Sequence, residues 1–167
     1  MDPENKKIAL RMIPYGLYVL TAQSGEDRVA ASTVNWVTQA SFTPALVAVG
    51  VKKDSGAHAV IKESGAFALN VLGKDQQSIA FTFFKPTRKE GGTLNGHKYH
   101  PGRNGAPLLD EMAAFLECSL LETVEKGDHS LFVGEVTEAG ISASPSGRPD
   151  DLTLTLRDLG AKVFYGG

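Results

Sequence analysis

Residues Tyr15–Asn35 read YGLYVLTAQSGEDRVAASTVN and contain two strand-forming runs around the turn Ser24-Gly25-Glu26-Asp27. β-Branched and aromatic residues favour strands, and a short polar turn with glycine favours a hairpin. We therefore predict an antiparallel pair formed by residues 15–23 and 28–35. A sheet that contains this hairpin is therefore antiparallel at least at these two strands.

Further strands and helices are indicated on both sides of the hairpin. A helix is expected from Asp2-Pro3-Glu4 to Pro14, because an aspartate cap and an early proline favour a helix start. Residues 91–107 are rich in glycine and proline and are expected to form a long irregular loop, with a second loop at 142–151. Strands are expected at residues 46–51, 66–72, 115–125, 131–138 and 159–165, and helices from Asp54-Ser55 to about Gly65 and from the cap Asp75 to Pro86.

About seven strands and three short helices, without regular βαβ alternation, favour a mainly β fold. We predict an antiparallel barrel with a few short accessory helices. The length of 167 residues indicates one domain over residues 1–167.

Composition excludes several classes of protein. The net charge of −2 argues against a nucleic-acid binder, and the single cysteine, Cys118, excludes an internal disulfide and suits a reducing compartment. No apolar run reaches the roughly 18 residues of a membrane span. The apolar stretch 15–22 follows Asp2 and Glu4 and is interrupted by Gly16, which argues against a signal peptide. We expect a cytoplasmic protein that contacts no membrane.

Polar residues gather at residues 31–41, ASTVNWVTQAS, at the end of a predicted strand. Short side chains there allow a flat ligand to approach the backbone, and amides offer both donors and acceptors to a heterocycle. The alternative is an ordinary strand end whose Ser and Thr side chains satisfy local backbone groups.

The segment Lys52–His58, KKDSGAH, precedes a predicted helix. Free N–H groups and the helix dipole at such a position favour an anion, and Ser55 and Lys53 add a hydroxyl and a charge. The alternative is a capped, solvated helix. The segment lacks the Gly-x-x-x-x-Gly-Lys pattern of a nucleoside triphosphatase.

Histidines occur in two turns or loops. Gly127-Asp128-His129 lies between two predicted strands, where the histidine is either structural or a hydrogen-bonding group at a ligand site. His97 and His100 lack the further ligands of a metal site, and we predict no metal. Cys118 lies among apolar residues and is expected to be an inert packed thiol.

Taken together, these segments resemble the flavin reductase-like, FMN-binding split-barrel family. The likeness extends from about Met12 to Phe164. Two positions depart from the family pattern: Trp36 stands where a small serine is usual, and His58 where threonine is usual. The matching features, in order, are Thr33-Val34-Asn35-Trp36, Ser41 with Pro44, the strand 46–51, Ser55 with His58, Phe67-Ala68-Leu69-Asn70-Val71-Leu72, and Gly127-Asp128-His129.

The resemblance implies a homodimeric, antiparallel, Greek-key-like split barrel that binds FMN, or FAD, near the subunit interface. Thr33, Asn35 and Ser41 would meet the isoalloxazine ring or ribityl chain. Ser55 would hold the phosphate, and the catalytic His129 would lie near the reactive face of the flavin or the nicotinamide. The full set of expected flavin-binding residues is Thr33, Val34, Asn35, Trp36, Ser41, Lys53, Ser55 and His58.

The resemblance also implies an activity, the reduction of FMN by NADH or NADPH through hydride transfer to flavin N5. The reduced flavin would supply a monooxygenase or another redox partner. The alternative is a module that holds FMN tightly and transfers electrons without its own nicotinamide reaction, which the bulky Trp36 favours. The sequence has no Gly-x-Gly-x-x-Gly motif, which could have distinguished NADH from NADPH. Residues 91–107 are either a lid or partner-facing segment, or a solvated loop.

Overall fold

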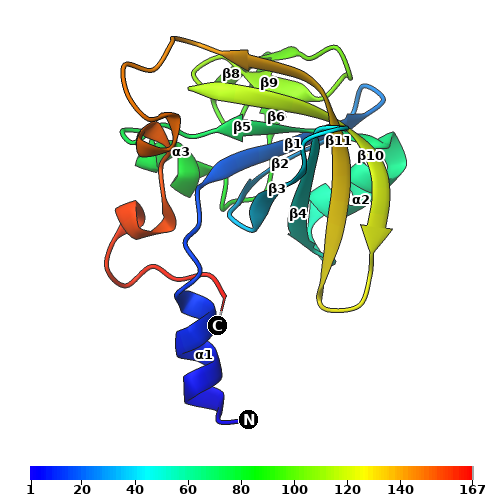
Figure 1. The fold of residues 1–167 in the computed structure, drawn as a ribbon. Coiled ribbons are helices and arrows are strands. Elements are labelled where there is room, and N and C mark those ends of the chain that lie inside the picture. The colour runs from blue at the N-terminus through cyan, green and yellow to red at the C-terminus, as the bar shows by residue number, and fades with distance from the viewer. Residues whose placement is uncertain (167) are drawn as a thin grey trace.

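Seven antiparallel strands form the main sheet of the computed structural model, which describes residues 1–166 (Figure 1). The expected hairpin is present, with Tyr18 opposite Val34 and Ser24 opposite Arg28. The strands, in their order across the sheet, are β2 (Arg28–Val34), β1 (Tyr18–Ser24), β5 (Ala66–Val71), β10 (Ala114–Val124), β11 (His129–Ile141), β4 (Leu46–Lys52) and β3 (Val37–Ser41).

The sheet curls into an open barrel because its two edge strands are consecutive in the sequence. Only Asn35 and Trp36 separate β2 from β3, so the opposite edges of the sheet must approach each other at this point. The backbone N–H of Gly50 donates to the carbonyl of Trp36 at 2.8 Å, which fixes this junction to β4. The prediction of a mainly β, antiparallel barrel is confirmed. The separate strand β3 was not predicted.

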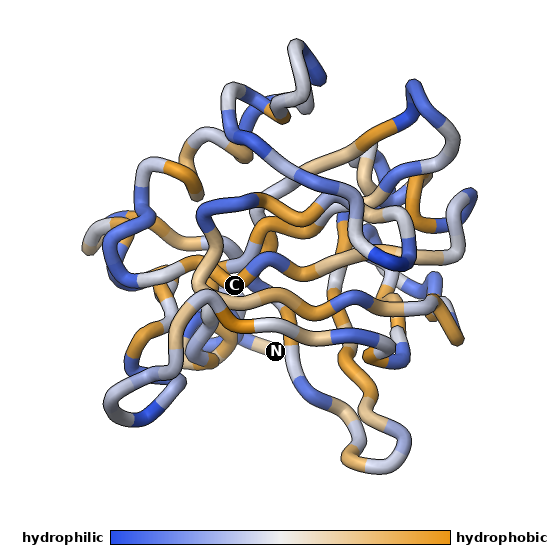
Figure 2. The backbone as a smooth tube through the Cα atoms, turned by 90° about the horizontal axis from the view of Figure 1, so that it is seen from above, coloured by the Kyte–Doolittle hydropathy of each residue, from blue (hydrophilic) through white to orange (hydrophobic). Residues whose placement is uncertain are grey.

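Helix α2 (Gly56–Ser64) closes the barrel core. Ser55 caps its first turn by accepting from the N–H of His58, and Gly65 ends it in the left-handed conformation at φ +66°. Its inner side packs on β1, β2 and β4, in a core that includes Leu20, Val49, Ile61, Phe67 and Phe132. Figure 2 shows the hydrophobic stretches along the strands and the hydrophilic residues at the outer turns.

A second apolar cluster covers the opposite face of β1. Helix α3 (Gln77–Thr82) contributes Ile79 and Ala80 to it, and Phe83 follows directly. The expected cap at Asp75 is wrong, because Gln76 occupies the cap position and its side chain makes no capping bond. Gln76 instead accepts from the N–H of Gly73, which holds the turn that precedes the helix.

Helix α1 (Pro3–Arg11) projects from the barrel and buries none of its residues (Figure 1). Asp2 caps it by accepting from the N–H groups of Glu4 and Asn5, as the sequence predicts. None of the helices within residues 1–166 has the length and apolar character that crossing a membrane requires.

The region predicted as a long irregular loop, residues 91–107, instead belongs to a second, four-stranded sheet. The prediction was wrong because the glycines form tight turns between very short strands: Gly91, Gly92 and Gly96 all have positive φ. Pro101 and Pro107 lie opposite each other at the end of one strand pair. The strands are β6 (Lys89–Glu90), β7 (Thr93–Leu94), β8 (His97–Pro101) and β9 (Pro107–Leu109).

The predicted strand at residues 159–165 is absent. Two short 3₁₀ helices, η1 (Pro149–Leu152) and η2 (Leu156–Leu159), precede Gly160, and the chain then runs on without pairing to a sheet edge within the described residues. The tail is attached instead to α1, where the Arg11 guanidinium lies 4.5 Å from the centre of the Phe164 ring. The C-terminus therefore returns to the N-terminal helix and lines the cavity described below.

Candidate functional site

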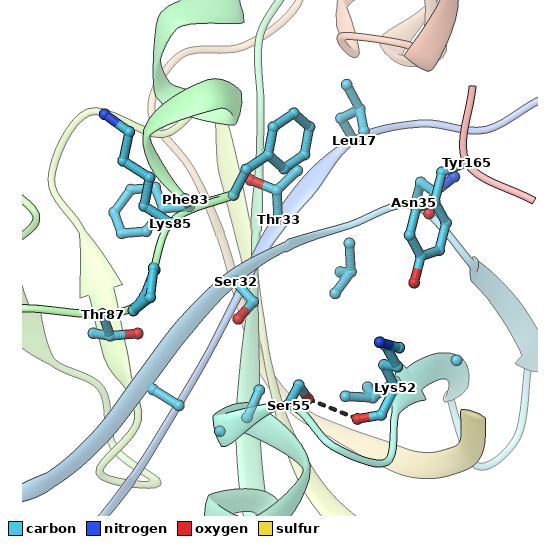
Figure 3. Close-up of a pocket in the computed structure, with 18 of the residues that line it drawn as sticks. Leu17, Ser32, Thr33, Asn35, Lys52, Ser55, Phe83, Lys85, Thr87 and Tyr165 are labelled. Atoms are coloured by element: carbon cyan, nitrogen blue, oxygen red, sulfur yellow. Dashed lines mark hydrogen bonds between the residues drawn. The ribbon is translucent and has the colours of Figure 1, made fainter. Parts of the chain in front are cut away.

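A cavity of about 750 Å³ lies where the two edges of the main sheet meet. Four segments supply most of its lining: β2 with Asn35, residues 50–57 from the end of β4 to the start of α2, residues 83–87 after α3, and residues 163–165 of the C-terminal tail. Leu17 and Leu156 complete it. Figure 3 shows Ser32 and Thr33 on β2 between Ser55 on one side and Phe83 on the other. The volume falls within the range of roughly 300–1,000 Å³ that is usual for small-molecule sites.

Strand β2 supplies the polar wall of this cavity. Asn35 is buried, and its amide Nδ2 has no hydrogen-bond partner among the described residues. The Thr33 hydroxyl donates to the carbonyl of Ala80 at 2.8 Å and so links β2 to α3. Its proton is therefore used, and the hydroxyl can only accept a hydrogen bond from a ligand. Ser32 and Val34 line the same wall. Because Asn35 lines the cavity and its amide lacks a partner, this amide is the candidate donor for a ligand acceptor.

The N-terminus of α2 forms the wall beside Ser55. The Ser55 hydroxyl donates to the Lys52 carbonyl at 2.7 Å and accepts from the N–H of His58 at 3.3 Å (Figure 3). Gly56 and Ala57 line the cavity in the first turn, where helix N–H groups lack intrahelical acceptors. A Cβ added at Gly56 would meet nothing within 4 Å, so the approach to this turn is open. This geometry suits a phosphate.

The two lysines of this segment point in different directions. Lys52, at the end of β4, lines the cavity, and its ammonium lies 3.0 Å from Asp54. Lys53 does not line the cavity, and its ammonium donates to the carbonyl of Glu125. Lys52 is the last residue of β4 and Lys53 begins the turn that follows, so the two side chains leave the backbone in different directions. The structure offers Lys52, where the sequence prediction chose Lys53.

His58 and Ser41 also lie outside the cavity lining. The His58 ring faces inward from α2, with Nε2 2.8 Å from the Ser130 hydroxyl and its ring centre 5.1 Å from that of Phe132. Ser41 ends β3, where its carbonyl accepts from the Gln39 side chain. The side chain of His58 is therefore a buried contact between α2 and β11 and is not directed at a phosphate.

The buried position of His58 predicts a pH-dependent stability. Burial lowers the pKa of His58 below its usual value of 6.5, against a smaller opposite effect of Glu125, because the charged ring loses solvation. Protonation therefore favours the unfolded chain, so stability is full above the unfolded pKa and falls as the pH drops towards the folded pKa. We expect the urea midpoint to fall between about pH 8 and about pH 5, and less so in His58→Gln. An equal fall in both proteins would contradict this role.

His129 lies behind the cavity wall, in a chain of three hydrogen-bonded groups. Its Nδ1 is 2.9 Å from the Asp128 carboxylate and its Nε2 is 2.7 Å from the Tyr165 hydroxyl. Because an ionised carboxylate only accepts, Nδ1 donates to Asp128, while Nε2 makes the second hydrogen bond, with the Tyr165 hydroxyl. The bond from His129 lowers the pKa of Asp128, and burial raises that of Tyr165, so both stay in the forms that this arrangement needs. Tyr165 itself lines the cavity.

Trp36 supports these rings from behind. Its ring centre is 4.5 Å from that of His129 and 5.4 Å from that of Tyr165. The indole rests on Gly50, where an added Cβ would lie 3.0 Å from it. Trp36 is not among the residues that line the cavity. It is therefore placed to orient His129 and Tyr165, and not to stack on a ligand in the cavity.

Three other side chains considered in the sequence, those of His97, His100 and Cys118, lie outside the cavity lining. His97 and His100 contact different carboxylates, Glu111 at 3.6 Å and Asp110 at 2.8 Å, and no three potential metal-ligating side chains gather within residues 1–166. Cys118 is fully buried, and burial raises the pKa of its thiol to about 12, so the expected packed thiol is confirmed.

Two segments of the site were missed by the sequence prediction. Residues 83–87 follow α3 and supply Phe83, Lys85 and Thr87, whose hydroxyl exchanges hydrogen bonds with the backbone of Ala31 at 2.8 and 3.0 Å. The tail supplies Tyr165. No local pattern in either segment indicates a ligand. Residues 83–87 reach the cavity only because they pack on β2, and Tyr165 reaches it only because the tail packs on Trp36.

Comparison with known proteins assigns this fold and cavity to a family. The model of the flavin reductase like domain matches residues 10–158. The chain belongs to the flavin reductase like domain family. The resemblance drawn from the sequence motifs is confirmed, and the family's description names a flavin.

Two solved structures and one relative illustrate the family. The NADH:FAD oxidoreductase of Streptomyces globisporus is 30% identical, with a TM-score of 0.72 over 84% of this chain and 86% of that chain. The flavin reductase component of a bacterial two-component tryptophan halogenase is 30% identical, with a TM-score of 0.71 over 84% and 88%. The high molecular weight rubredoxin of Moorella thermoacetica is 35% identical over 135 residues, 80% of this chain and 58% of that protein.

The chain spans between about a fifth and three fifths of the length of the curated relatives that it matches first. It corresponds to nearly the full length of the two solved reductases. A flavin reductase like domain therefore occurs both within longer proteins and as almost the whole of a shorter one.

Proposed function

We propose that this chain reduces a flavin with electrons from NADH or NADPH. The observation that carries the proposal is the cavity itself, in which an unpaired buried amide, Asn35 Nδ2, shares the lining with an open helix N-terminus at Gly56. A flavin mononucleotide has both matching features, a ring edge of carbonyl and nitrogen acceptors and a terminal phosphate. The names of the two solved relatives point to the same reaction.

Each wall of the cavity then has a part in binding. Asn35 would donate to the ring edge, and the N–H groups of Gly56 and Ala57, with Ser55, would hold the phosphate. Lys52 would add a positive charge. Among the other expected residues, Thr33 and Val34 line the ring or ribityl region, while Ser41, Lys53 and the His58 side chain are expected to act only indirectly.

The bound flavin would supply the hydride acceptor, and the protein would supply orientation and exclusion of water. Phe83 and Tyr165 offer apolar surface that shields the cavity, and the Tyr165 hydroxyl is held by His129. Asp128 fixes the ring of His129 from the other side. No acid–base step is required of these groups, so His129 and Tyr165 serve to position the nicotinamide beside the flavin.

This positioning role gives a testable prediction. His129→Ala and Tyr165→Phe each remove one end of the 2.7 Å hydrogen bond, so each is expected to slow NADH oxidation by roughly tenfold. The Kd for FMN should change by less than about twofold, because neither bond holds the phosphate or the ring edge.

The double variant separates a shared role from two independent ones. If both residues act through one bond, combining the substitutions adds little to either single effect. Additive losses, or loss of FMN binding in His129→Ala, would contradict the proposed role. Stopped-flow absorbance with preloaded FMN measures the step directly.

We further propose a homodimer in the cytoplasm that delivers reduced flavin to a separate monooxygenase or halogenase. The exposed apolar residues Ile8, Met12 and Ile13 on and after α1 are suited to a protein contact, and the buried free thiol Cys118 suits a reducing compartment. Light scattering at several concentrations tests the dimer. A monomer at all of them would refute it.

The first experiment is a visible titration of the purified protein with FMN and FAD, followed by anaerobic NADH or NADPH. Rapid bleaching with one nucleotide would support the reductase and identify its donor. A bound flavin that neither nucleotide reduces would support the electron-transfer module instead. Failure to bind either flavin would refute both functions.

A further inference from the structure

The connection from β4 to α2 lies against the turn from β10 to β11. Lys52 ends β4 opposite His129, which begins β11. The N–H of Lys53 donates to the carbonyl of Asp128 at 3.0 Å. Figure 3 shows Ser55 bonded to Lys52 on the cavity side of this connection. The expected phosphate turn and the segment that carries His129 are therefore neighbours in the fold.

His58 joins the same two segments from within the protein. Its backbone N–H donates to the Ser55 hydroxyl in the cap of α2. Its side chain is turned inward, with Nε2 2.8 Å from the hydroxyl of Ser130, and Ser130 is fully buried. Because Ser130 directly follows His129 in β11, one residue links the phosphate turn to the neighbour of His129.

The bond between His58 and Ser130 is shielded from solvent. His58 is 8% exposed, and its ring centre is 5.1 Å from that of Phe132 in the barrel core. A buried polar group that loses its partner is neither solvated nor hydrogen-bonded, so breaking this contact is unfavourable. The bond therefore holds the first turn of α2 at a fixed place on β11.

A second link between α2 and the same turn lies at the surface. The Glu125 carboxylate is 3.0 Å from the Lys62 ammonium and 3.7 Å from His58 Nε2. The Glu125 and Lys62 side chains are 41% and 46% exposed, so solvent screens their attraction and the pair adds little rigidity. This ion pair serves as the matched control for the buried bond.

We propose that His58 is a positioning residue that couples the phosphate turn to His129, so that the protein reduces FMN faster than riboflavin. The proposal rests on the proposed flavin function. A phosphate bound at the start of α2 would fix its first turn. The His58–Ser130 bond would then hold β11, and with it His129, in the position that orients the nicotinamide. Interactions with a part of the substrate that does not react can raise the rate in this way.

Trp36 reports this coupling without any flavin. It is the only tryptophan in the sequence, and its ring centre is 4.5 Å from that of His129. Inorganic phosphate, at concentrations that displace FMN, should change the Trp36 emission of the unaltered protein, whereas chloride at equal ionic strength should not. The double variant His58→Leu with Ser130→Ala replaces both partners by apolar groups, so it is expected to fold and to lose this change. Unchanged emission of the unaltered protein would overturn the proposal.

Reduction rates at saturating flavin give the second readout. Anaerobic stopped-flow absorbance should give a rate constant roughly tenfold higher for FMN than for riboflavin. The double variant, and Ser130→Ala alone, should slow the reduction of FMN to the rate of riboflavin, whose own rate should change by less than about twofold. An equal fall in both rates would indicate a merely structural role and overturn the proposal.

Two further variants complete the test. His58→Gln retains a side-chain amide that can bond to Ser130 and should keep most of the preference for FMN. Lys62→Ala removes only the exposed ion pair and should keep all of it. A loss in Lys62→Ala as large as that in the double variant would also overturn the proposal. If the unaltered protein reduces neither flavin, the proposed function itself fails.

Discussion

Gly56→Glu is expected to weaken FMN binding by about a hundredfold without destabilising the protein. Gly56 opens α2 beside Ser55, and an added side chain there meets no atom within 4 Å. A carboxylate in the first turn stabilises a helix through its dipole, yet it repels a phosphate that uses the same N–H groups. Repulsion at about 6 Å with an effective dielectric constant of about 20 amounts to roughly 3 kcal/mol per charge pair, enough for this loss.

Gly56→Glu is expected to keep or raise the stability of the protein while it weakens FMN binding, so a general loss of folding cannot produce the same result. Urea denaturation should give a midpoint no lower than that of the unaltered protein, while fluorescence titration gives a raised Kd for FMN. Gly56→Gln, which has the same shape without the charge, should lose far less affinity, and riboflavin, which lacks the phosphate, should bind both variants alike. Equal losses for FMN and riboflavin would show that the phosphate is not bound at α2.

Gly134→Val is expected to destabilise the fold by about 3 kcal/mol or more. Gly134 lies in β11, where a Cβ would come 2.7 Å from the Phe67 ring and 2.9 Å from Cys118 Cβ. Phe67 and Cys118 are fully buried in the barrel core, so neither can move without displacing its neighbours. The added side chain must therefore push β11 away from β5 and β10.

Urea denaturation monitored by circular dichroism measures this loss. Gly147→Val is the matched control, because Gly147 has no atom within 4 Å of an added Cβ and no positive φ. We expect the control to keep its midpoint to within a few tenths of a molar in urea. A similar midpoint for both variants would mean that the barrel core accommodates the change, contrary to the close packing around Phe67.

Local sequence patterns, which involve residues close together in the chain, determined many of the turns and helix ends of this protein. The hairpin around Gly25, the Ser55 cap of α2 and the left-handed Gly65 that ends it all depend on neighbours in the chain, and the structure contains each of them. The ordered motifs from Thr33 to His129 were sufficient to identify the family. Their order along the chain can be read from the sequence alone, without knowing which residues are close in space.

Only the tertiary structure decided which of these residues meet. Lys52 lines the cavity and Lys53 does not, because β4 ends at Lys52 and the chain turns at Lys53. The His58 side chain reaches Ser130 of β11 only because the curled sheet brings that strand close to the first turn of α2. Tyr165 reaches His129 only because the tail returns across the barrel. Such contacts join residues far apart in the chain, so their energies depend on packing, and no local sequence pattern encodes them.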